Sequence, residues 1–253
     1  MRASIIGSGN VATHLAKALH QAQVEIHGIW SHQFENAVLL AKQVGAKAVR
    51  QISEIIQDES DIVLISVKDD AIAEVAAQLR NYRGIVAHTS GAIALNALSG
   101  NANYGVFYPL QTFSKHKNLD FSQVPLCLEA NTNQNLQQLK MLAALLSNSV
   151  FEVDTEQRKI LHLAAVFACN FPNYLYGVAQ QLLAQHQLDF DIIRPLIAET
   201  AQKVQTALPI EMQTGPAIRN DQQTLKKHED LLKGHADWLT IYKLLSEQIK
   251  KNR

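Results

Sequence analysis

Three small residues near the start of the chain have the types and spacing of a turn that could hold a diphosphate. The stretch "ASIIGSGNVATHLAKAL" is an apolar run, then a cluster of small residues, then a helical pattern. Gly7 could adopt the dihedral angles of a tight turn, Gly9 has no Cβ to collide with a phosphate, and Ala12 permits close packing of a helix on a strand. The N–H groups at the start of the helix would face the anion. The pattern predicts a dinucleotide-binding site, with an ordinary strand–turn–helix as the alternative, and its residues are Gly7, Ser8, Gly9, Asn10, Val11 and Ala12.

The end of the next expected strand indicates which dinucleotide would bind. An NAD site usually has Asp or Glu there, about 20 residues after the glycines, to hydrogen-bond the ribose 2′-hydroxyl. This chain has "GIWSHQFENA" instead, so Ser31 and His32 occupy the place of the acid and could donate hydrogen bonds to a 2′-phosphate. No arginine follows this strand, and His32 would also fit a solvated loop. The sequence therefore favours NADP over NAD as the cofactor.

Two later strand ends should reach the same crevice, because ligands of such sheets lie at the carboxyl ends of the strands. The segment "SVKDDAI" supplies Val67 as an apolar wall for the nicotinamide ring. The Ser in "AHTSGA" lacks the pattern of a nucleophile elbow, which argues against serine-hydrolase chemistry. That segment instead predicts further cofactor-binding residues, namely His88, Thr89, Ser90 and Gly91.

A nicotinamide enzyme needs a proton donor beside the bond that receives the hydride, and "EQRKILHLAAVFACNF" offers candidates. At about 100° per residue, Lys159, His162 and Asn170 fall within an arc of roughly 80° on one helix face. The residues around them are mostly apolar, which predicts a lined cavity. His162 could be the general acid, Lys159 could act only in a buried site, and Asn170 could hold a carbonyl group. Alternatively, His162 is a core histidine bonded to a backbone carbonyl, and Asn170 is a partner of a kink at Pro172.

A loop nearer the C-terminus offers a candidate for binding the substrate. In "QTGPAIRND", Gly215 and Pro216 fix a turn, and Arg219 could clamp a carboxylate or phosphate with two hydrogen bonds. The alternative is that Arg219 and Asp221 pair with each other or cap the helix that follows.

The elements that would position these residues change type once along the chain. Up to about Asp154, short β-rich runs alternate with helical patterns, and "DIVLISV" is typical of a strand covered on both faces. This alternation predicts an α/β fold with a Rossmann-type doubly wound parallel sheet. Beyond Asp154 the sequence indicates helices alone, and Pro172 should kink or break the first of them. We expect a dinucleotide-binding domain over residues 1–154 and a smaller all-helical domain over residues 155–253.

Composition favours a small-molecule partner. The 253 residues include 23 Lys and Arg and 23 Asp and Glu, so the chain has no basic field for nucleic acid and no polybasic run for a membrane surface. No apolar run approaches the ~18 residues of a membrane span, and the early first strand leaves no room for a signal peptide. Cys127 and Cys169 lie far apart, which predicts two buried cysteines in a reducing compartment and no metal site. We expect a cytoplasmic protein.

Six motifs in order carry a resemblance to a known family: "GSGNVATHLA", "ISVKDDAI", "HTSGA", "YPLQTFS", "HLAAVFACNF" and "TGPAIRND". Together they resemble a bacterial family of NADP oxidoreductases that pair a Rossmann-like domain with a helical domain of unknown function. That family is similar to pyrroline-5-carboxylate reductase, to deazaflavin-dependent NADP oxidoreductases and to 6-phosphogluconate and β-hydroxyacid dehydrogenases. The resemblance implies that the helical domain pairs two subunits into a homodimer and closes over the nicotinamide.

The chain departs from the family pattern at three places. The family commonly has His-Pro where this chain has Tyr108-Pro109, and Gly-Asp where it has Asn220-Asp221. It often has an arginine where this chain has His32, which weakens the assignment of NADP.

The leading prediction is an NADP-dependent oxidoreductase that moves a hydride between nicotinamide and a small carbonyl or imine substrate. An NADP-binding sensor or scaffold without turnover is the alternative from another class, because no residue is compelled to be catalytic. A dehydrogenase with a deazaflavin as its redox partner is a third possibility.

Overall fold

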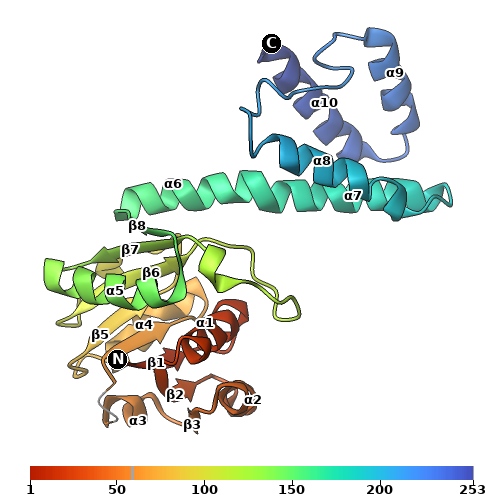
Figure 1. Cartoon of the computed structure of the whole chain (residues 1–253). Helices are drawn as coiled ribbons and strands as arrows, with labels where there is room; N and C mark the ends of the chain where they lie inside the picture. The colour runs from red at the N-terminus through yellow and green to blue at the C-terminus, as the bar shows by residue number, and fades with distance from the viewer. Residues whose placement is uncertain (58–59, 253) are drawn as a thin grey trace. The chain divides into compact units, whose positions relative to one another are not determined.

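The structure, a computed structural model, describes residues 1–57 and 60–252 of the chain (Figure 1). The chain divides into two compact units, Met1–Asn170 and Phe171–Arg253. The composition changes at Asp154, but helix α6 (Thr155–Ala165), the first beyond that point, belongs to the sheet-bearing unit.

The first unit is built on a sheet that has eight strands in the described residues, in the order β3-β2-β1-β4-β5-β6-β7-β8. Strands β1 to β6 are parallel to their neighbours, β7 is antiparallel to β6, and β8 is parallel to β7. The order reverses between β1 and β4, where the chain returns from the β2–β3 side. The strands are β1 (Arg2–Ile6), β2 (Glu25–Trp30), β3 (Lys47–Val49), β4 (Ile62–Ile65), β5 (Ile85–His88), β6 (Tyr104–Pro109), β7 (Leu126–Ala130) and β8 (Val150–Glu152).

The predicted Rossmann-type α/β fold is confirmed, with one correction. The sheet is mixed rather than wholly parallel, because the connection from β6 to β7 holds only a short 3₁₀ turn, η3 (Phe121–Gln123). Parallel neighbours are usually joined by a crossover helix, and this connection contains none.

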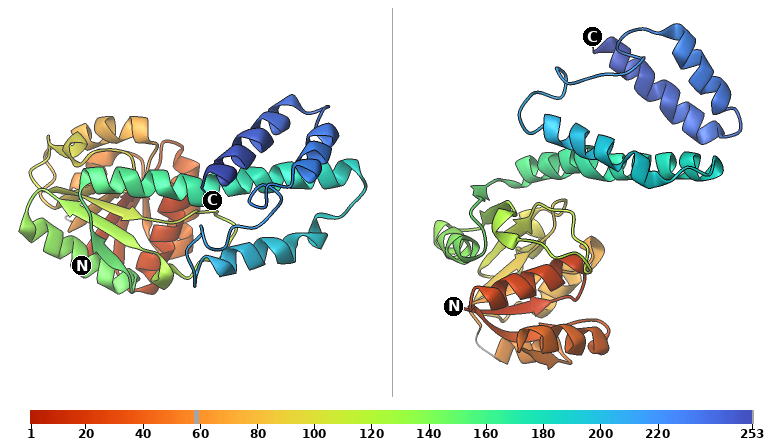
Figure 2. Two further views of the ribbon diagram at one scale, coloured as in Figure 1. Left: turned by 90° about the horizontal axis from the view of Figure 1, so that it is seen from above. Right: turned by 45° about the vertical axis from the view of Figure 1, so that its right-hand side comes forward.

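Helices cover both faces of this sheet (Figure 2). Helices α1, α2 and α5 share one apolar core with side chains from β1, β4, β5 and β6, whereas α3 and α4 share a second core on the other face. The helices of this unit up to β8 are α1 (Asn10–Gln21), α2 (Phe34–Val44), α3 (Ile52–Gln57), α4 (Ile72–Gln78) and α5 (Asn133–Leu146), with 3₁₀ turns η1 (Asp69–Ala71) and η2 (Leu95–Leu98).

The helical run after β8 contains a π turn where a kink or break was expected. Helical conformation is continuous from Thr155 to Gln185 through α6, the π turn η4 (Val166–Asn170) and α7 (Phe171–Gln185). Proline has no N–H to donate, and a π turn just before Pro172 lets the helical path continue past it. Cys169 lies in this turn and is exposed, so the prediction of two buried cysteines is wrong for Cys169, whereas Cys127 is buried.

The second unit buries few of its apolar side chains. Its described residues place only Ala217, Leu225 and Leu232 among the buried hydrophobic residues of the chain. Its helices are α7, α8 (Arg194–Lys203), α9 (Gln222–Leu231) and α10 (Ala236–Lys251), with the 3₁₀ turn η5 (Phe190–Ile192). The large apolar side chains that it exposes are Phe171, Tyr174, Leu188, Ile192, Leu196, Val204, Leu208, Ile210, Leu231, Leu244 and Leu245.

Within the described residues, no helix is both long and apolar enough to cross a membrane.

Candidate active site

The glycine-rich turn lies at the point where the strand order reverses, between the carboxyl ends of β1 and β4. Gly7 has a φ of +130°, which side chains rarely tolerate, and its N–H donates to the Trp30 carbonyl at 2.8 Å. A Cβ on Gly7 would overlap the carbonyl group of Ser66, just beyond β4. Gly7 is therefore required by the fold itself, both for its backbone conformation and for close packing of β1 against β4.

Gly9 stands in the opposite situation. Its φ of −73° is ordinary for any residue, and a Cβ built on it meets no other atom within 4 Å. It is the N-cap of α1, no side chain caps that helix, and the first intrahelical bond runs from Thr13 N–H to Gly9 O. The first N–H groups of α1 have no acceptor within the helix, and the position of a Cβ on Gly9, at the start of that helix, is open. Neither strain nor packing explains this glycine, but a diphosphate held on the helix N-terminus would fill that space.

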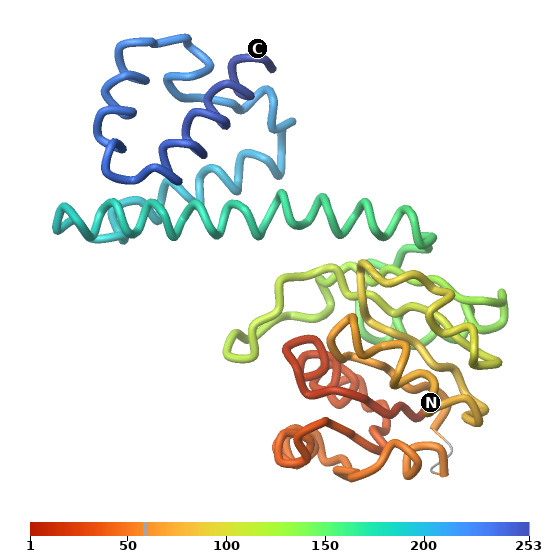
Figure 3. Tube along the Cα trace, turned by 180° about the vertical axis from the view of Figure 1, so that it is seen from behind, coloured from red at the N-terminus to blue at the C-terminus, as the bar shows by residue number. Residues whose placement is uncertain are grey.

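The neighbours of the two glycines are held by the fold. Ala12 of α1 is fully buried, and the Asn10 amide donates to the Phe113 carbonyl at 3.0 Å. His14 reaches the Ser114 carbonyl at 2.9 Å from the next turn of α1. These two bonds tie the long β6–β7 loop to α1. The loop lies beside α1 in Figure 3. The side chain of Asn10 thus positions a loop beside the predicted diphosphate site.

Near the end of β2 lies an arginine, Arg50, that the sequence pattern did not predict. Ser31 is nearly buried and its hydroxyl lies 2.7 Å from that of Ser8, whereas His32 is exposed. Arg50 follows β3, whose last residue, Val49, pairs with Trp30 at the end of β2. The Trp30 indole donates to the Arg50 carbonyl at 3.3 Å. An arginine therefore does stand beside Ser31 and His32, supplied by the neighbouring strand.

The Arg50 guanidinium is held over an aromatic ring. Its Cζ lies 3.9 Å from the centroid of Phe34, the first residue of α2, in a cation–π arrangement. Glu54 is nearby, but its Oε1 accepts hydrogen bonds from the backbone N–H groups of Arg50 and Gln51. Arg50 remains exposed at the carboxyl edge of the sheet.

The segment after β5 forms a compact turn rather than an open row of ligands. The Thr89 hydroxyl donates to Ser66 Oγ at 3.2 Å, and the Ser90 hydroxyl accepts the N–H groups of Ala92 and Ile93 at 3.1 Å. Thr89 and Ser90 are buried, whereas Val67 is half-buried. Of these side chains, Val67 is the most open to a ring bound at this edge.

His88 supports this edge from inside. It is fully buried, its Nδ1 accepts the Ser90 N–H at 3.2 Å, and its Nε2 has no hydrogen-bond partner in the described part of the chain. Burial, helped by repulsion from the Arg158 guanidinium, lowers the pKa of His88 to about 4. The ring is therefore neutral at physiological pH, and its side chain has no surface to offer a dinucleotide.

A buried ion pair fixes the start of α6 against the sheet. Arg158 is fully buried, pairs with Glu129 on β7 and donates to the Ile93 carbonyl at 2.7 Å. The Thr155 hydroxyl bonds the same carboxylate at 3.0 Å and accepts the N–H of Leu95 at 3.2 Å. These bonds join α6, β7 and the loop after β5 into one rigid corner.

One helical turn further on, His162 meets a partner that the sequence did not predict. Its Nδ1 lies 3.1 Å from the hydroxyl of Tyr108 near the end of β6. The Tyr108 ring is buried, and this burial raises the pKa of its phenol to about 12. Tyr108 stood out in the sequence only as a departure from the His-Pro pattern. The signal that could have found it is topological, since β6 ends at the same edge as β5.

The other predicted catalytic residues are more exposed than expected. Lys159 forms an ion pair with Glu156 at 2.8 Å on the surface, and Asn170 ends the π turn in an exposed position. A π turn advances fewer degrees per residue than an α-helix, so the arc estimated for Lys159, His162 and Asn170 does not apply across it. The apolar residues around His162 are also exposed in the first unit, so the predicted lined cavity is not formed there; they are Ile160, Leu163 and Phe167.

Arg219 lies in the second unit, exposed in the turns before α9. Asp221 accepts the Thr224 N–H at 3.1 Å and caps α9, which is one of the alternatives that the sequence left open. Hydrogen bonds from Thr224 lower the pKa of Asp221. The role of Arg219 in binding substrate stays a prediction.

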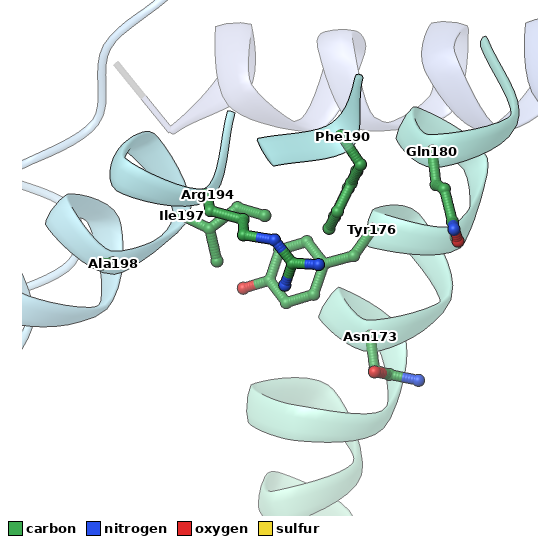
Figure 4. A pocket seen from close by; sticks show the side chains of 8 residues that line it. Asn173, Tyr176, Gln180, Phe190, Arg194, Ile197 and Ala198 are labelled. Carbon is green, nitrogen blue, oxygen red and sulfur yellow. The ribbon is translucent and has the colours of Figure 1, made fainter. Parts of the chain in front are cut away.

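The second unit has a cleft of about 540 Å³ between one face of α7 and the η5–α8 segment (Figure 4). Tyr176, Phe190 and Arg194 point into it, and the Arg194 Cζ lies 5.1 Å from the centroid of Phe190. Asp191 also pairs with Arg194. The arrangement would suit a small ligand with an apolar part and an anionic group, although part of the guanidinium charge is already matched.

Two family descriptions match the chain. Residues 2–87 match the family described as NADP oxidoreductase, coenzyme F420-dependent, and residues 124–249 match a domain of unknown function, DUF2520. Among solved structures, a Bacteroides fragilis protein described as a candidate NADP oxidoreductase is 40% identical, with a TM-score of 0.92. The alignment covers 99% of this chain and 98% of that one.

More distant structures share the fold. A pyrroline-5-carboxylate reductase from Streptococcus pyogenes is 16% identical, with a TM-score of 0.64 over 99% of this chain and 98% of that one. An imine reductase from Myxococcus stipitatus in complex with NADP+ is 15% identical, with a TM-score of 0.65 over 99% and 92% of the two chains. A search of curated proteins found no match.

The two glycines of the turn should respond to the same substitution in different ways. Gly7→Ala strains the backbone and overlaps the Ser66 carbonyl, so it should destabilise the fold by about 1–3 kcal/mol or more. Gly9→Ala should change stability by no more than about 1 kcal/mol but weaken dinucleotide binding at least about tenfold, because its Cβ enters the open space above α1. Urea unfolding and NADPH titration separate the two effects. Unchanged affinity in the Gly9 variant would contradict the assignment of this space to the diphosphate.

Proposed function

This chain belongs to the family of NADP oxidoreductases that join a Rossmann-type domain to a helical domain of unknown function, and we propose that it is an NADPH-dependent reductase of a small carbonyl or imine compound. The observation that carries the proposal is the pairing of two features on one sheet edge. The open first turn of α1 lies at the end of β1, and an exposed imidazole, anchored by Tyr108, lies at the end of β6. One suits a diphosphate and the other suits proton transfer.

In this proposal each residue's role follows from its position on the sheet edge. The amides that follow Gly9 hold the diphosphate, Val67 and the turn at Gly91 flank the nicotinamide side, and His162 donates a proton to the substrate. When bound, NADPH supplies the hydride. Asn170 and Lys159 remain candidates for contacts with the substrate, as does Arg219.

The choice of a carbonyl or imine substrate is supported by the kind of chemistry available. A C=O or C=N bond that accepts a hydride needs a proton at its heteroatom, which an imidazole can supply near neutral pH. The shared fold of the pyrroline-5-carboxylate reductase and the imine reductase is in keeping with such a substrate. A sensor without turnover would have no use for an exposed imidazole anchored at the cofactor edge.

The preference for NADP is supported by the charge at the end of β2. Arg50, with Ser31 and His32 beside it, offers hydrogen-bond donors and a positive charge to a 2′-phosphate. Residues 31–33, which follow this strand, include no acidic residue, which would favour the 2′-hydroxyl of NAD.

We also infer a homodimer formed through the helical unit. That unit exposes many large apolar side chains and buries few, so it lacks an apolar core of its own within the described residues. Exposed apolar surface of this extent marks an interaction face. A second copy of the chain would bury this surface on both partners.

The proposed reaction is tested with the purified full chain, NADPH and a panel of small carbonyls and imines. We expect loss of NADPH absorbance with at least one member, and a fall in kcat of about 100-fold or more in His162→Ala with little change in NADPH affinity. His20→Ala, which removes an exposed histidine at the end of α1, is the control and should keep full activity. NADPH binding without turnover on the whole panel would favour the sensor, and turnover only with added deazaflavin would name that coenzyme as the partner.

Arg50→Ala should weaken NADPH binding by about 10–100-fold and leave NADH binding within about twofold, because a charge-assisted hydrogen bond to the 2′-phosphate is lost. Arg83→Ala is the matched control, since it removes an exposed arginine that precedes β5, at the opposite edge of the sheet. Equal losses for NADPH and NADH in the Arg50 variant would show that this residue does not read the 2′-phosphate.

The dimer is tested by light scattering coupled to size exclusion. The wild-type chain should have twice its monomer mass of 28.1 kDa, and Leu196→Glu on α8 should shift it toward the monomer. Leu39→Glu on α2 is the control, because Leu39 and Leu196 are similarly exposed, at 62% and 66%. A monomeric wild-type chain at micromolar concentration would refute the inference.

A further inference from the structure

We propose that Tyr108 is a positioning residue for His162. The phenol of Tyr108 keeps Nδ1 of the imidazole in a hydrogen bond, so that Nε2 is the nitrogen that exchanges a proton with the substrate. The inference rests on the proposed function, in which His162 is the proton donor.

The geometry holds one edge of the imidazole and leaves the other open. Tyr108 is buried in a small cluster with Val106 and Cys127, against which Leu161 of α6 packs. Its hydroxyl lies 3.1 Å from His162 Nδ1, and the two rings meet edge to face at a centroid distance of 6.2 Å. His162 as a whole is exposed. The protein thus binds the Nδ1 edge, while Nε2 lies on the opposite side of the ring.

Gly91 shows how tightly this pair is enclosed. A Cβ on Gly91 would lie 2.7 Å from Tyr108 Cζ and 2.8 Å from His162 Nδ1. Gly91 does not have a positive φ, so its backbone would accept a side chain. The close approach of the two rings, rather than backbone strain, therefore accounts for glycine at this position.

A phenol suits the task because it can both donate and accept a hydrogen bond. Burial raises the pKa of Tyr108 to about 12, so the phenol keeps its proton at neutral pH. It can donate to Nδ1 when that nitrogen is unprotonated and accept from it when it carries a proton. The contact therefore persists whether or not Nδ1 carries a proton, whereas a carboxylate could only accept and an ammonium group could only donate.

In this proposal the contact determines which nitrogen of His162 gives up a proton. As the hydride supplied by bound NADPH, with its two electrons, reaches the substrate carbon, the π bond of the C=O or C=N group breaks and its electron pair moves to the oxygen or nitrogen. That pair forms a bond to the proton of Nε2 as the Nε2–H bond of protonated His162 breaks. The electron pair of the N–H bond stays on Nε2. Nδ1 keeps its proton in the hydrogen bond to Tyr108, and solvent then returns a proton to Nε2.

The kinetic test compares Tyr108→Phe with Tyr104→Phe at the start of the same strand. Both variants keep their rings, so both should fold. We expect Tyr108→Phe to lower kcat by about 10–100-fold, with KM within about threefold and NADPH affinity within about twofold, because only the orientation of the acid is lost. Tyr104→Phe should behave as wild type. A Tyr108→Phe variant with wild-type kcat would overturn the proposal.

A spectroscopic test does not depend on turnover. In long-range ¹⁵N–¹H spectra of the histidine rings, with His162 assigned by its loss in His162→Gln, the Nδ1 signal should shift in Tyr108→Phe and not in Tyr104→Phe. Gly91→Ala, which forces the two rings apart, should shift it as well. An Nδ1 signal unaffected by Tyr108→Phe would refute the contact. If Tyr108→Phe shifts the signal but the wild-type chain reduces no substrate, the proposed function is wrong and the contact is right.

Discussion

The candidate site depends on one buried ion pair. Arg158 has no exposed surface, and its charge is matched by Glu129, with the Ile93 carbonyl as a second acceptor. Removing either partner would leave a buried charge or carboxylate without compensation, a cost of about 3–5 kcal/mol. The position of α6 on the sheet is therefore strongly specified. His162 lies four residues beyond Arg158, on the same side of the helix, so the ion pair also fixes the distance from the imidazole to Tyr108.

The reversal of β7 gives this ion pair its place. Because β7 is antiparallel to β6, Glu129 lies opposite Val106, and Cys127 lies opposite Tyr108. Residues two apart on a strand share a face, so Glu129 and Tyr108 both reach the face on which α6 packs. The same Arg158 that holds α6 helps to keep His88 neutral beneath the carboxyl edge of the sheet. The Arg158 charge thus both fixes α6 on the sheet and disfavours protonation of His88.

Local patterns predicted the parts of this fold that follow from local physics. The alternation of strands and helices and the turn around Gly7 each depend on a few neighbouring residues, and the structure contains both. What could not be predicted depends on pairing between distant strands. Arg50 reaches the end of β2 only because β3 pairs with it, and Tyr108 meets His162 only because β6 and α6 are neighbours in space. The sequence also predicted a lined cavity at the helix face around His162, which is exposed. Helical periodicity identifies an apolar face but does not show whether the same chain covers it or a partner does.

The apolar residues around His162 connect the proposed proton donor to the inferred dimer. Ile160, Leu163 and Phe167 are exposed on the helix that carries His162, within the first unit itself. An imidazole surrounded by water-covered apolar groups would share its proton with bulk solvent, whereas electrostatic and proton-transfer steps are stronger in a site from which water is excluded. Burial of these residues, by substrate or by the second copy, would supply that exclusion. The first unit therefore gives a reason for association that is independent of the apolar surface on the second.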